Sequence, residues 1–395
     1  MKKLIVLSLV TIVLLSACTS GTNNTAPSPT LTNAPAPGGT SEPVSSPENT
    51  PEPERRFVSV EYSTSFSVEY ITDDVLLVSD TENQRFLLVP RGQEAPAGHE
   101  DALIVYTPVE RVLFSSSTQF GMLVPFDIWD NMGGLVSNPT DWPFPELNER
   151  IADGSIVYVG NSMGSELDYE LIQELNPELS FVYSGPSAQT DLMLKLDELG
   201  LPYAVDNEYM EATHQGRMEW IKFLAPFFGK TGEAVEYVDA MFVRLADMES
   251  RIEGADKPKV AWGRVDGGVA RVVGADSYVA KMLDSVGCEY LFSHIEGNGT
   301  VQISTEEFYD AVMDADIWIY SVTPTSMSGY DALLEIQPIM ADVPCVINKQ
   351  VWQIGVNYYS FTAEIDYQVI ELASIIHPEL FPEVENLRQF QKMAG

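Results

Sequence analysis

A serine between two glycines is the first feature of the sequence that could do chemistry. The segment Gly160-Asn-Ser-Met-Gly164 satisfies the pattern Gly-x-Ser-x-Gly, in which hydrolases place a nucleophilic serine on a turn between a strand and a helix. Ser162 would need an imidazole base, and the candidates are His214, His294 and His377. Neither His294 nor His377 has a distinctive position, and the next helix is expected only near Asp168. A secreted serine hydrolase using Ser162 is therefore the alternative function, and we expect that the protein is not an enzyme.

A second polar loop follows the apolar strand expected at Val112–Phe114. Three hydroxyls and an amide at the end of a strand suit hydrogen bonding to a ligand, and they also suit capping of the next helix. Both roles can hold together. The residues of this loop that we expect to contact a ligand are Ser116, Ser117, Thr118 and Gln119.

Aromatic and arginine side chains recur near expected strand ends and helix starts in the second half of the chain. Aromatic faces with a few guanidiniums suit a bulky, partly apolar, anionic ligand such as a ferric chelate, because arginine offers paired donors to carboxylate or catecholate oxygens. Taken singly, each residue is explained better by a structural role, since a tryptophan in a strand usually belongs to the core. The candidate ligand contacts are Arg217, Trp262, Arg264, Tyr278, Trp352, Tyr358 and Tyr359.

Metal and phosphate chemistry have little support in the sequence. No set of His, Asp and Glu residues shows the spacing of metal ligands, and no Gly-x-x-x-x-Gly-Lys pattern occurs. We therefore predict no metal site and no cofactor.

The segment 214–254, which includes Arg217, lies between the other candidate residues of the two groups. Apolar residues recur there every three or four positions, which predicts a helix at 231–253 with Thr231 as its N-cap and Gly254 at its C-terminal end. Such a helix is about 33 Å long, enough to join two lobes. Pro226 should kink or end the helix before it.

Short apolar strands alternate with helices on both sides of this joint. We expect an N-terminal α/β lobe at 102–213 and a C-terminal α/β lobe at 255–395, both doubly wound, after a small antiparallel β lead-in at 56–101. Ligands of such lobes bind where loops leave the C-terminal ends of strands. The strands expected in the N-terminal lobe are 104–106, 112–114, 156–159, 179–183 and 203–205, and those in the C-terminal lobe are 259–265, 270–273, 290–292, 317–321, 345–347 and 351–354.

The N-terminus predicts export and anchoring. A basic start, an apolar run and Leu15-Ser-Ala-Cys18 indicate a signal peptide at 1–17 and match the lipobox of bacterial lipoproteins, so Cys18 is expected to carry lipid; an ordinary signal with an incidental cysteine is the alternative. Residues 18–55 lack apolar periodicity and predict a disordered tether.

The charge of the chain narrows the choice of partners. It has 22 basic and 58 acidic residues, a formal net charge of −36, which argues against nucleic acid or an anionic bilayer surface as partner. Cys288 and Cys345 could pair in an exported protein, but without framework spacing we interpret both as buried thiols. We expect a monomer.

Three stretches of the chain resemble one family. Segments 159–179, 216–230 and 274–287, among them Gly216-Arg-Met-Glu-Trp-Ile-Lys-Phe-Leu224, resemble solute-binding lipoproteins of ABC importers that handle ferric siderophores, haem and cobalamin. The resemblance covers roughly residues 108–382. It implies two lobes joined by one long helix, a ligand held between them, and Ser162 as a ligand contact rather than a nucleophile.

The resemblance also implies partners and a location. Glu170 and Glu306, with Glu307 as the alternative to Glu306, fall on the helix glutamates that meet arginines of the membrane permease in that family. We therefore expect an extracellular protein, anchored to the cell membrane through Cys18, that captures a ferric siderophore or similar iron chelate and delivers it to an ABC permease. Haem and cobalamin are the alternative ligands.

Overall fold

The computed structural model describes residues 55–161, 166–185 and 187–395. The expected signal peptide, Cys18, the tether and Ser162 lie outside the described residues. Residues Glu54–Gly395 form one compact unit. Within the described ranges, no helix combines the length and the apolar character needed to span a bilayer.

The first described element is a five-stranded sheet. Its strands β1 to β4 pair antiparallel, whereas β4 and β5 pair parallel with Leu88 opposite Val105. Residues 104–106 therefore belong to this sheet and not to the sheet of the N-terminal lobe, because a short apolar strand does not specify its partner. The strands are β1 (Arg56–Phe57), β2 (Ser67–Tyr70), β3 (Leu76–Ser79), β4 (Arg85–Pro90) and β5 (Leu103–Thr107).

This sheet packs on the helices of the joint. The ring of Phe66 lies 4.9 Å from Trp220 and 5.5 Å from Phe223, centre to centre. The buried carboxylate of Glu219 accepts hydrogen bonds from three consecutive backbone N–H groups, those of residues 61–63, over 2.6 to 2.8 Å. The expected β lead-in is thus fastened to the joint by aromatic packing and one buried charge.

The sheet of the N-terminal lobe is parallel, with the strand order β12-β11-β6-β7-β8. Its two faces are both buried, since Leu113 and Phe114 of β6 point into different apolar clusters. The order reverses between β6 and β11, which makes their carboxyl ends a topological switch point. The strands are β6 (Val112–Phe114), β7 (Met132–Leu135), β8 (Val157–Tyr158), β11 (Leu179–Val182) and β12 (Tyr203–Val205), with the separate pair β9 (Gly160–Asn161) and β10 (Glu166–Leu167).

Strand β7 was not expected from the sequence, because its Met-Gly-Gly-Leu composition has low strand propensity. The glycines are explained by close approach: a Cβ on Gly133 would lie 2.7 Å from the side chain of Arg111. The helices of this lobe are α1 (Ser117–Leu123), α2 (Pro145–Ala152), α3 (Tyr169–Leu175) and α4 (Ser187–Leu199).

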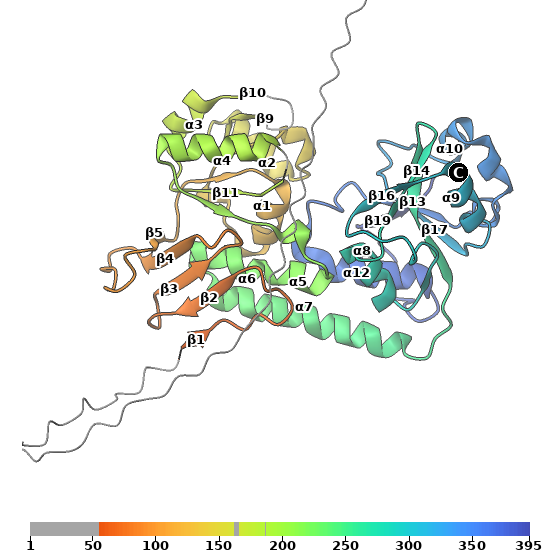
Figure 1. Cartoon of the computed structure of the whole chain (residues 1–395), viewed down its shortest axis with the longest axis horizontal. Helices are drawn as coiled ribbons and strands as arrows, with labels where there is room; N and C mark the ends of the chain where they lie inside the picture. Colours follow the sequence, from red (N-terminus) through yellow and green to blue (C-terminus); the bar gives the residue numbers. More distant parts are fainter. Residues whose placement is uncertain (1–54, 162–165, 186) are drawn as a thin grey trace, which may run out of the picture. The chain divides into compact units, whose positions relative to one another are not determined.

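The joint contains the long helix α7 (Thr231–Ile252), as predicted (Figure 1). Before it come α5 (His214–Glu219), α6 (Ile221–Leu224) and a 3-10 turn that begins at Ala225, so the prediction that Pro226 ends the helix is confirmed. The expected N-cap at Thr231 is wrong, since the helix starts after Lys230 without a side-chain cap. The apolar stripe is confirmed by the buried side chains of Ala234, Val238, Met241, Leu245 and Met248.

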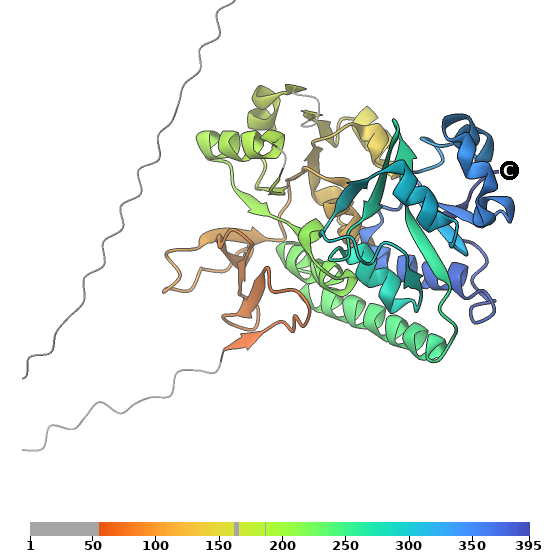
Figure 2. The ribbon, with the colours of Figure 1, turned by 45° about the vertical axis from the view of Figure 1, so that its right-hand side comes forward.

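The C-terminal lobe has a mixed sheet of the order β16-β14-β13-β17-β18-β19, with β15 also paired to β13. Figure 2 shows the teal strands of this sheet beside the blue helices of the same lobe. Strands β13, β15, β17 and β18 are parallel, and the others are antiparallel to their neighbours. The strands are β13 (Lys259–Asp266), β14 (Val269–Val273), β15 (Glu289–Tyr290), β16 (Thr300–Ile303), β17 (Ile317–Tyr320), β18 (Val351–Ile354) and β19 (Phe390–Lys392). The helices are α8 (Tyr278–Ser285), α9 (Thr305–Val312), α10 (Tyr330–Ile336), α11 (Pro344–Ile347) and α12 (Ile365–Ile376).

One expected strand is a helix. Residues 345–347 form α11, because Pro344 is suited to the first turn of a helix and the Cys345 carbonyl then accepts from the N–H of Gln350, turning the chain into β18. Cys345 and Cys288 are both buried and free, as interpreted from their spacing. The fold class is confirmed: two α/β lobes and one long joining helix.

The two lobes meet directly at helix α1. The hydroxyls of Ser117 and Ser360 lie 2.9 Å apart, and the Thr362 hydroxyl donates to the Thr118 carbonyl over 2.6 Å. A Cβ on Gly121 would lie 1.8 Å from the Ser360 carbonyl oxygen, so only glycine permits this approach.

Candidate ligand-binding site

Three loops of the N-terminal lobe line one small recess at the switch point. They leave the carboxyl ends of β6, β11 and β12, where a doubly wound sheet binds ligands. The recess has a volume of about 160 Å³ and is lined by Ser116, Thr118, Gln119, Tyr183, Asp206, Glu208 and Tyr209. The sequence-predicted loop 116–119 therefore does lie at a cavity, with Ser117 turned to the other lobe.

The loop after β6 is held by a capping box. Ser116 caps α1 by accepting from the Thr118 N–H, and Gln119 Oε1 accepts from the N–H groups of Ser115 and Ser116 over 3.1 Å each. These bonds fix the orientation of the Gln119 amide. Its Nε2 is buried and has no hydrogen-bond partner in the part of the chain that the structure describes. The capping role is thus present, and the ligand contact stays a prediction.

Asp206, directly after β12, was not among the predicted residues. Its carboxylate is buried: Oδ1 accepts from the Glu208 N–H over 3.0 Å, and Oδ2 has no partner among the described residues. Burial raises the pKa of Asp206 well above its ordinary value, and repulsion by Glu208 raises it further. The position could have been found, because it follows an expected strand just as the loop 115–119 does.

Arg217 is buried and bonded to Glu208. Its Nε and Nη2 donate to Glu208 Oε2 over 2.8 and 2.5 Å, and its guanidinium carbon lies 4.3 Å from the ring centre of Tyr278. Arg217 is therefore held between the N-terminal lobe and α8, with two of its donors already used. Contact of Arg217 or Tyr278 with a ligand remains a prediction.

A second cavity, of about 360 Å³, adjoins the wall of the C-terminal lobe. Tyr209 lines both cavities, so the two are neighbours. The predicted residues that line the second one are Trp262, Arg264, Tyr278, Tyr358 and Tyr359. Five of the predicted contacts are thus brought to one place.

Two arginines, Arg264 and Arg271, line the second cavity and make this side of it positively charged. Arg264 Nε donates to Asp266 Oδ2 over 2.9 Å, and Arg271 pairs with the other oxygen of the same carboxylate. The hydrogen bond from Arg264, followed by that from Arg271, lowers the pKa of Asp266. Two guanidiniums share one carboxylate, so the pair keeps a net positive charge, which suits acidic ligand oxygens.

The aromatic residues of this wall pack on one another. Tyr358 lies 6.2 Å from Trp262 and 5.2 Å from Tyr359, centre to centre, and Tyr359 is exposed. Burial raises the pKa of Tyr358 well above its ordinary range, so it stays a neutral phenol. Trp352 lies elsewhere on β18, with the ammonium group of Lys392 5.5 Å from its ring centre, and does not line either cavity.

The three histidines considered as bases lie in three different environments. His214 is buried in α5, and burial lowers its pKa to about 4. His377 Nε2 lies 3.0 Å from the Val286 carbonyl, and His294 is exposed. Among the described residues, no group of three or more His, Cys, Asp and Glu side chains is arranged to hold a metal ion.

Residues 114–358 match the sequence profile of a family described as periplasmic binding protein. The chain belongs to the periplasmic binding protein family. It is 29% identical over 320 residues to an uncharacterized lipoprotein of Methanocaldococcus jannaschii, and the match covers 76% of this chain and 74% of that relative. The family resemblance seen in the sequence is thereby confirmed.

Solved structures of other periplasmic binding proteins share the fold. A periplasmic haem binding protein from Pseudomonas aeruginosa has a TM-score of 0.56 and 15% identity, over 72% of this chain and 98% of that one. A periplasmic vitamin B12 binding protein of Vibrio cholerae has a TM-score of 0.53 and 16% identity, over 69% and 98%. At these identities the likeness concerns the fold alone.

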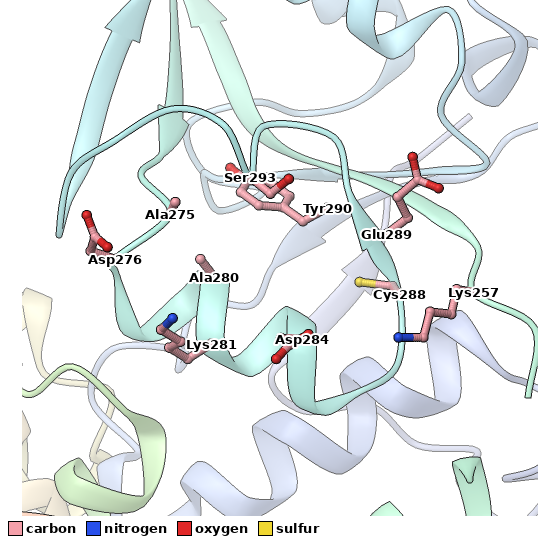
Figure 3. Close-up of a pocket in the computed structure, with 10 residues that line it drawn as sticks. All are labelled: Lys257, Ala275, Asp276, Ala280, Lys281, Asp284, Cys288, Glu289, Tyr290 and Ser293. Atoms are coloured by element: carbon pink, nitrogen blue, oxygen red, sulfur yellow. The ribbon is translucent and has the colours of Figure 1, made fainter. Parts of the chain in front are cut away.

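Another hollow of this periplasmic binding protein, of about 500 Å³, lies on the C-terminal lobe beside α8 and β15 (Figure 3). Its lining contains none of the predicted contacts, and Lys257, Lys281 and Asp284 are exposed there. The thiol of Cys288 donates to the Leu283 carbonyl, and burial raises its pKa to about 12, so it is not a thiolate at neutral pH.

The glutamates expected to meet a permease are exposed near the starts of two helices. Glu170 lies in the first turn of α3 and Glu306 in the first turn of α9, and both are exposed. Glu307 is also exposed in the first turn of α9, so the alternative remains open. The docking role stays a prediction for this periplasmic binding protein.

Proposed function

We propose that this protein is the extracellular substrate-binding lipoprotein of an ABC importer, anchored through Cys18, and that it captures a ferric siderophore or a similar iron chelate between its two lobes. Glu170 and Glu306 dock the loaded protein on the permease. Haem and cobalamin are the alternative ligands, and the protein performs no chemistry on any of them.

One observation carries this proposal. The recess at the ends of β6, β11 and β12 and the cavity beside Trp262 and Arg264 are neighbours that share Tyr209. Apart from Tyr209 and Met210, the residues that line the two come from different lobes. Together they offer hydroxyls, the Gln119 amide and two carboxyl groups on one side, and aromatic rings with guanidiniums on the other. A bulky ligand with a partly apolar body and acidic oxygens fits such a surface.

The comparisons add support of a different kind. The Methanocaldococcus jannaschii relative is a lipoprotein, which favours a lipid anchor at Cys18 here. The Pseudomonas aeruginosa and Vibrio cholerae proteins bind haem and vitamin B12, so related folds hold large metal chelates. The positive wall of Arg264 and Arg271 makes acidic chelates our first choice.

A binding panel tests the proposal. Full-length protein in detergent is titrated with a ferric hydroxamate, a ferric catecholate, haem and cobalamin, and quenching of tryptophan fluorescence is followed. We expect saturable binding of one member with a dissociation constant below about 10 μM. Absence of saturable binding across the panel would contradict the proposal.

Variants then locate the site. Arg264→Ala leaves Asp266 paired with Arg271, so the fold should persist while affinity falls at least about tenfold, as expected for loss of a charged contact. Lys281→Ala, in the hollow of Figure 3, is the matched control that should leave affinity unchanged. Equal losses in the two variants would place the ligand elsewhere.

A further inference from the structure

Two residues that line the recess of the N-terminal lobe each carry a buried polar atom that no described residue satisfies. One is an acceptor, Oδ2 of Asp206, and the other is a donor, Nε2 of Gln119. Both side chains are 1% exposed. A buried acceptor or donor without a partner costs about 1–3 kcal/mol, so a ligand that satisfied both atoms would recover this energy on binding.

The unpaired atom of each group is defined by its other bonds. Gln119 Oε1 already accepts from Ser115 and Ser116, so the remaining polar atom of the amide is the Nε2 donor. Asp206 Oδ1 already accepts from the Glu208 N–H, which leaves Oδ2 as the free oxygen. Two residues that line the recess therefore carry one unpaired donor and one unpaired acceptor.

The neighbouring cation does not satisfy Asp206. Nε and Nη2 of Arg217 both donate to Glu208, and Arg217 also lies over Tyr278. Burial consequently raises the pKa of Asp206, with a further rise from Glu208 that Arg217 only partly opposes. A cation on the ligand would suit Asp206 Oδ2 but would leave the Gln119 N–H without an acceptor. A ligand group with one N–H and one carbonyl would match both atoms.

We propose that this recess binds a primary carboxamide of the ligand, whose N–H donates to Asp206 Oδ2 and whose carbonyl accepts from Gln119 Nε2. The volume of about 160 Å³ is close to that of a cavity that holds benzene, about 150 Å³, so a carboxamide with a short apolar stem fits. The inference rests on the proposed function, in that the ligand occupies the space between the lobes. It adds that the ligand presents an amide to the N-terminal lobe and acidic oxygens to the C-terminal one.

Small probes of one shape test this recess without the natural ligand. Benzamide, benzoate, acetophenone and benzamidinium are titrated into the full-length protein in detergent, and binding is followed by ligand-observed proton NMR. Benzamide is expected to bind at least about tenfold more tightly than benzoate, which lacks the N–H, or acetophenone, which offers only a carbonyl, because each lacks one partner of the pair. Tighter binding of benzamidinium than of benzamide would reveal a cation site and overturn the proposal.

An isosteric substitution reverses the expected preference. In Asp206→Asn, Oδ1 keeps the bond from Glu208 and Nδ2 replaces the free oxygen, so the recess presents two donors. Benzamide affinity should fall at least about tenfold and benzoate should gain relative to benzamide, since two donors suit a carboxylate. Asp284→Asn, the same change on an exposed carboxylate of the hollow in Figure 3, should leave both probes unaffected. Unchanged benzamide binding in Asp206→Asn overturns the proposal.

Two further measurements cover a variant that fails to fold. Gln119→Glu keeps an oxygen for the Ser115 and Ser116 N–H groups but replaces the donor by an acceptor, so benzamide should again be lost. A crystal of the unmodified protein grown with benzamide should show the amide nitrogen within hydrogen-bond distance of Asp206 Oδ2. Benzamide bound elsewhere, or not bound at all, contradicts the carboxamide recess while the chelate panel still tests the proposed function.

Discussion

The guanidinium carbon of Arg217 lies 4.3 Å from the ring centre of Tyr278, while Nε and Nη2 of the same side chain bond to Glu208. Burial by itself lowers the pKa of Arg217, but the attraction of Glu208 and Tyr278 raises it overall, so the guanidinium stays charged. Because Tyr278 belongs to α8 and Glu208 to the N-terminal lobe, one buried cation links the two lobes at the candidate site.

Removing this cation should cost stability. Arg217→Met leaves Glu208 buried without its partner, and we expect the free energy of unfolding to fall by about 3–5 kcal/mol in urea denaturation. The double variant Arg217→Met with Glu208→Gln removes the orphaned charge and should recover part of the loss. A loss below about 1 kcal/mol for the single variant would contradict the role assigned to this pair.

Asp206 predicts a pH dependence of stability. Its pKa is raised above the ordinary value of 3.8 by burial and then by Glu208, with Arg217 acting in the opposite direction, and the phenols of Tyr183 and Tyr209 line the same recess. A carboxyl whose pKa is higher in the folded than in the unfolded state contributes stability that is complete below pH 3.8 and is lost as the pH rises through the raised pKa.

The substitution Asp206→Asn removes this loss. At pH 7 the variant should be more stable than the wild type by about 1–3 kcal/mol, and the difference should shrink as the pH is lowered toward 4. Thermal unfolding between pH 4 and 8 measures it. A variant that is less stable at pH 7, or a difference independent of pH, would show that the carboxyl is satisfied in the folded protein.

The contact between the lobes at α1 depends on Gly121. In Gly121→Ala the new Cβ would lie 1.8 Å from the Ser360 carbonyl oxygen, so the two segments must separate and the Ser117–Ser360 hydrogen bond should break. We expect a loss of about 1–3 kcal/mol in the free energy of unfolding, as for overpacking. Gly232→Ala in α7, where nothing lies within 4 Å of the added Cβ, should instead stabilise by about 0.5 kcal/mol. A change in the free energy of unfolding with the same sign in both variants would refute the close contact of Gly121 with Ser360.

Hydrogen bonds to Glu219 hold residues 61–63, next to the N-terminal sheet, against the joint, and this role can be tested. Glu219→Gln replaces the carboxylate that accepts from the N–H groups of residues 61–63, which should cost about 1.5–3 kcal/mol and raise hydrogen exchange in that segment. Glu236→Gln, an exposed position on α7, serves as control and should have no effect on either. Unaltered hydrogen exchange at residues 61–63 in Glu219→Gln would contradict the role assigned to the Glu219 hydrogen bonds.

If the two glutamates dock on the permease, their loss should impair transport without changing ligand affinity. The double variant Glu170→Ala with Glu306→Ala should keep ligand affinity but reduce cellular uptake at least about tenfold, because charge pairs at an interface direct association. Alanine at Glu174 and Asp310, exposed positions on the same two helices, gives the matched control. Normal uptake by the Glu170 and Glu306 variant would disprove the docking assignment.

The sequence predicted those elements correctly whose structure depends on a local pattern of residues. The stripe from Ala234 to Met248 specified helix α7, and Pro226 specified the end of the helix before it, because both effects act within a few residues. The strand expected at 345–347 failed for the converse reason: β-branched residues favour a strand, yet Pro344 starts a turn of helix.

The candidate site was predictable only in part. The strand-end rule found the loop of Ser116 and Gln119, and applied once more it would have found Asp206 directly after 203–205. The bond of Arg217 to Glu208 could not be foreseen, since it depends on how the chain turns between them. Trp352 was predicted as a ligand contact but lines neither cavity, and the ammonium group of Lys392 lies near its ring. Aromatic character alone does not show whether a residue lines a cavity.

The position of the bound metal tests the central claim most directly. Crystals are grown with whichever of the ferric siderophores, haem and cobalamin binds most tightly, and an anomalous difference map is collected at the iron or cobalt absorption edge. We predict one peak between the loop of Ser116 and the wall formed by Trp262 and Arg264. A peak in the hollow of Lys257 and Lys281, or no ordered peak between the lobes, would contradict the claim that the lobes enclose a metal chelate.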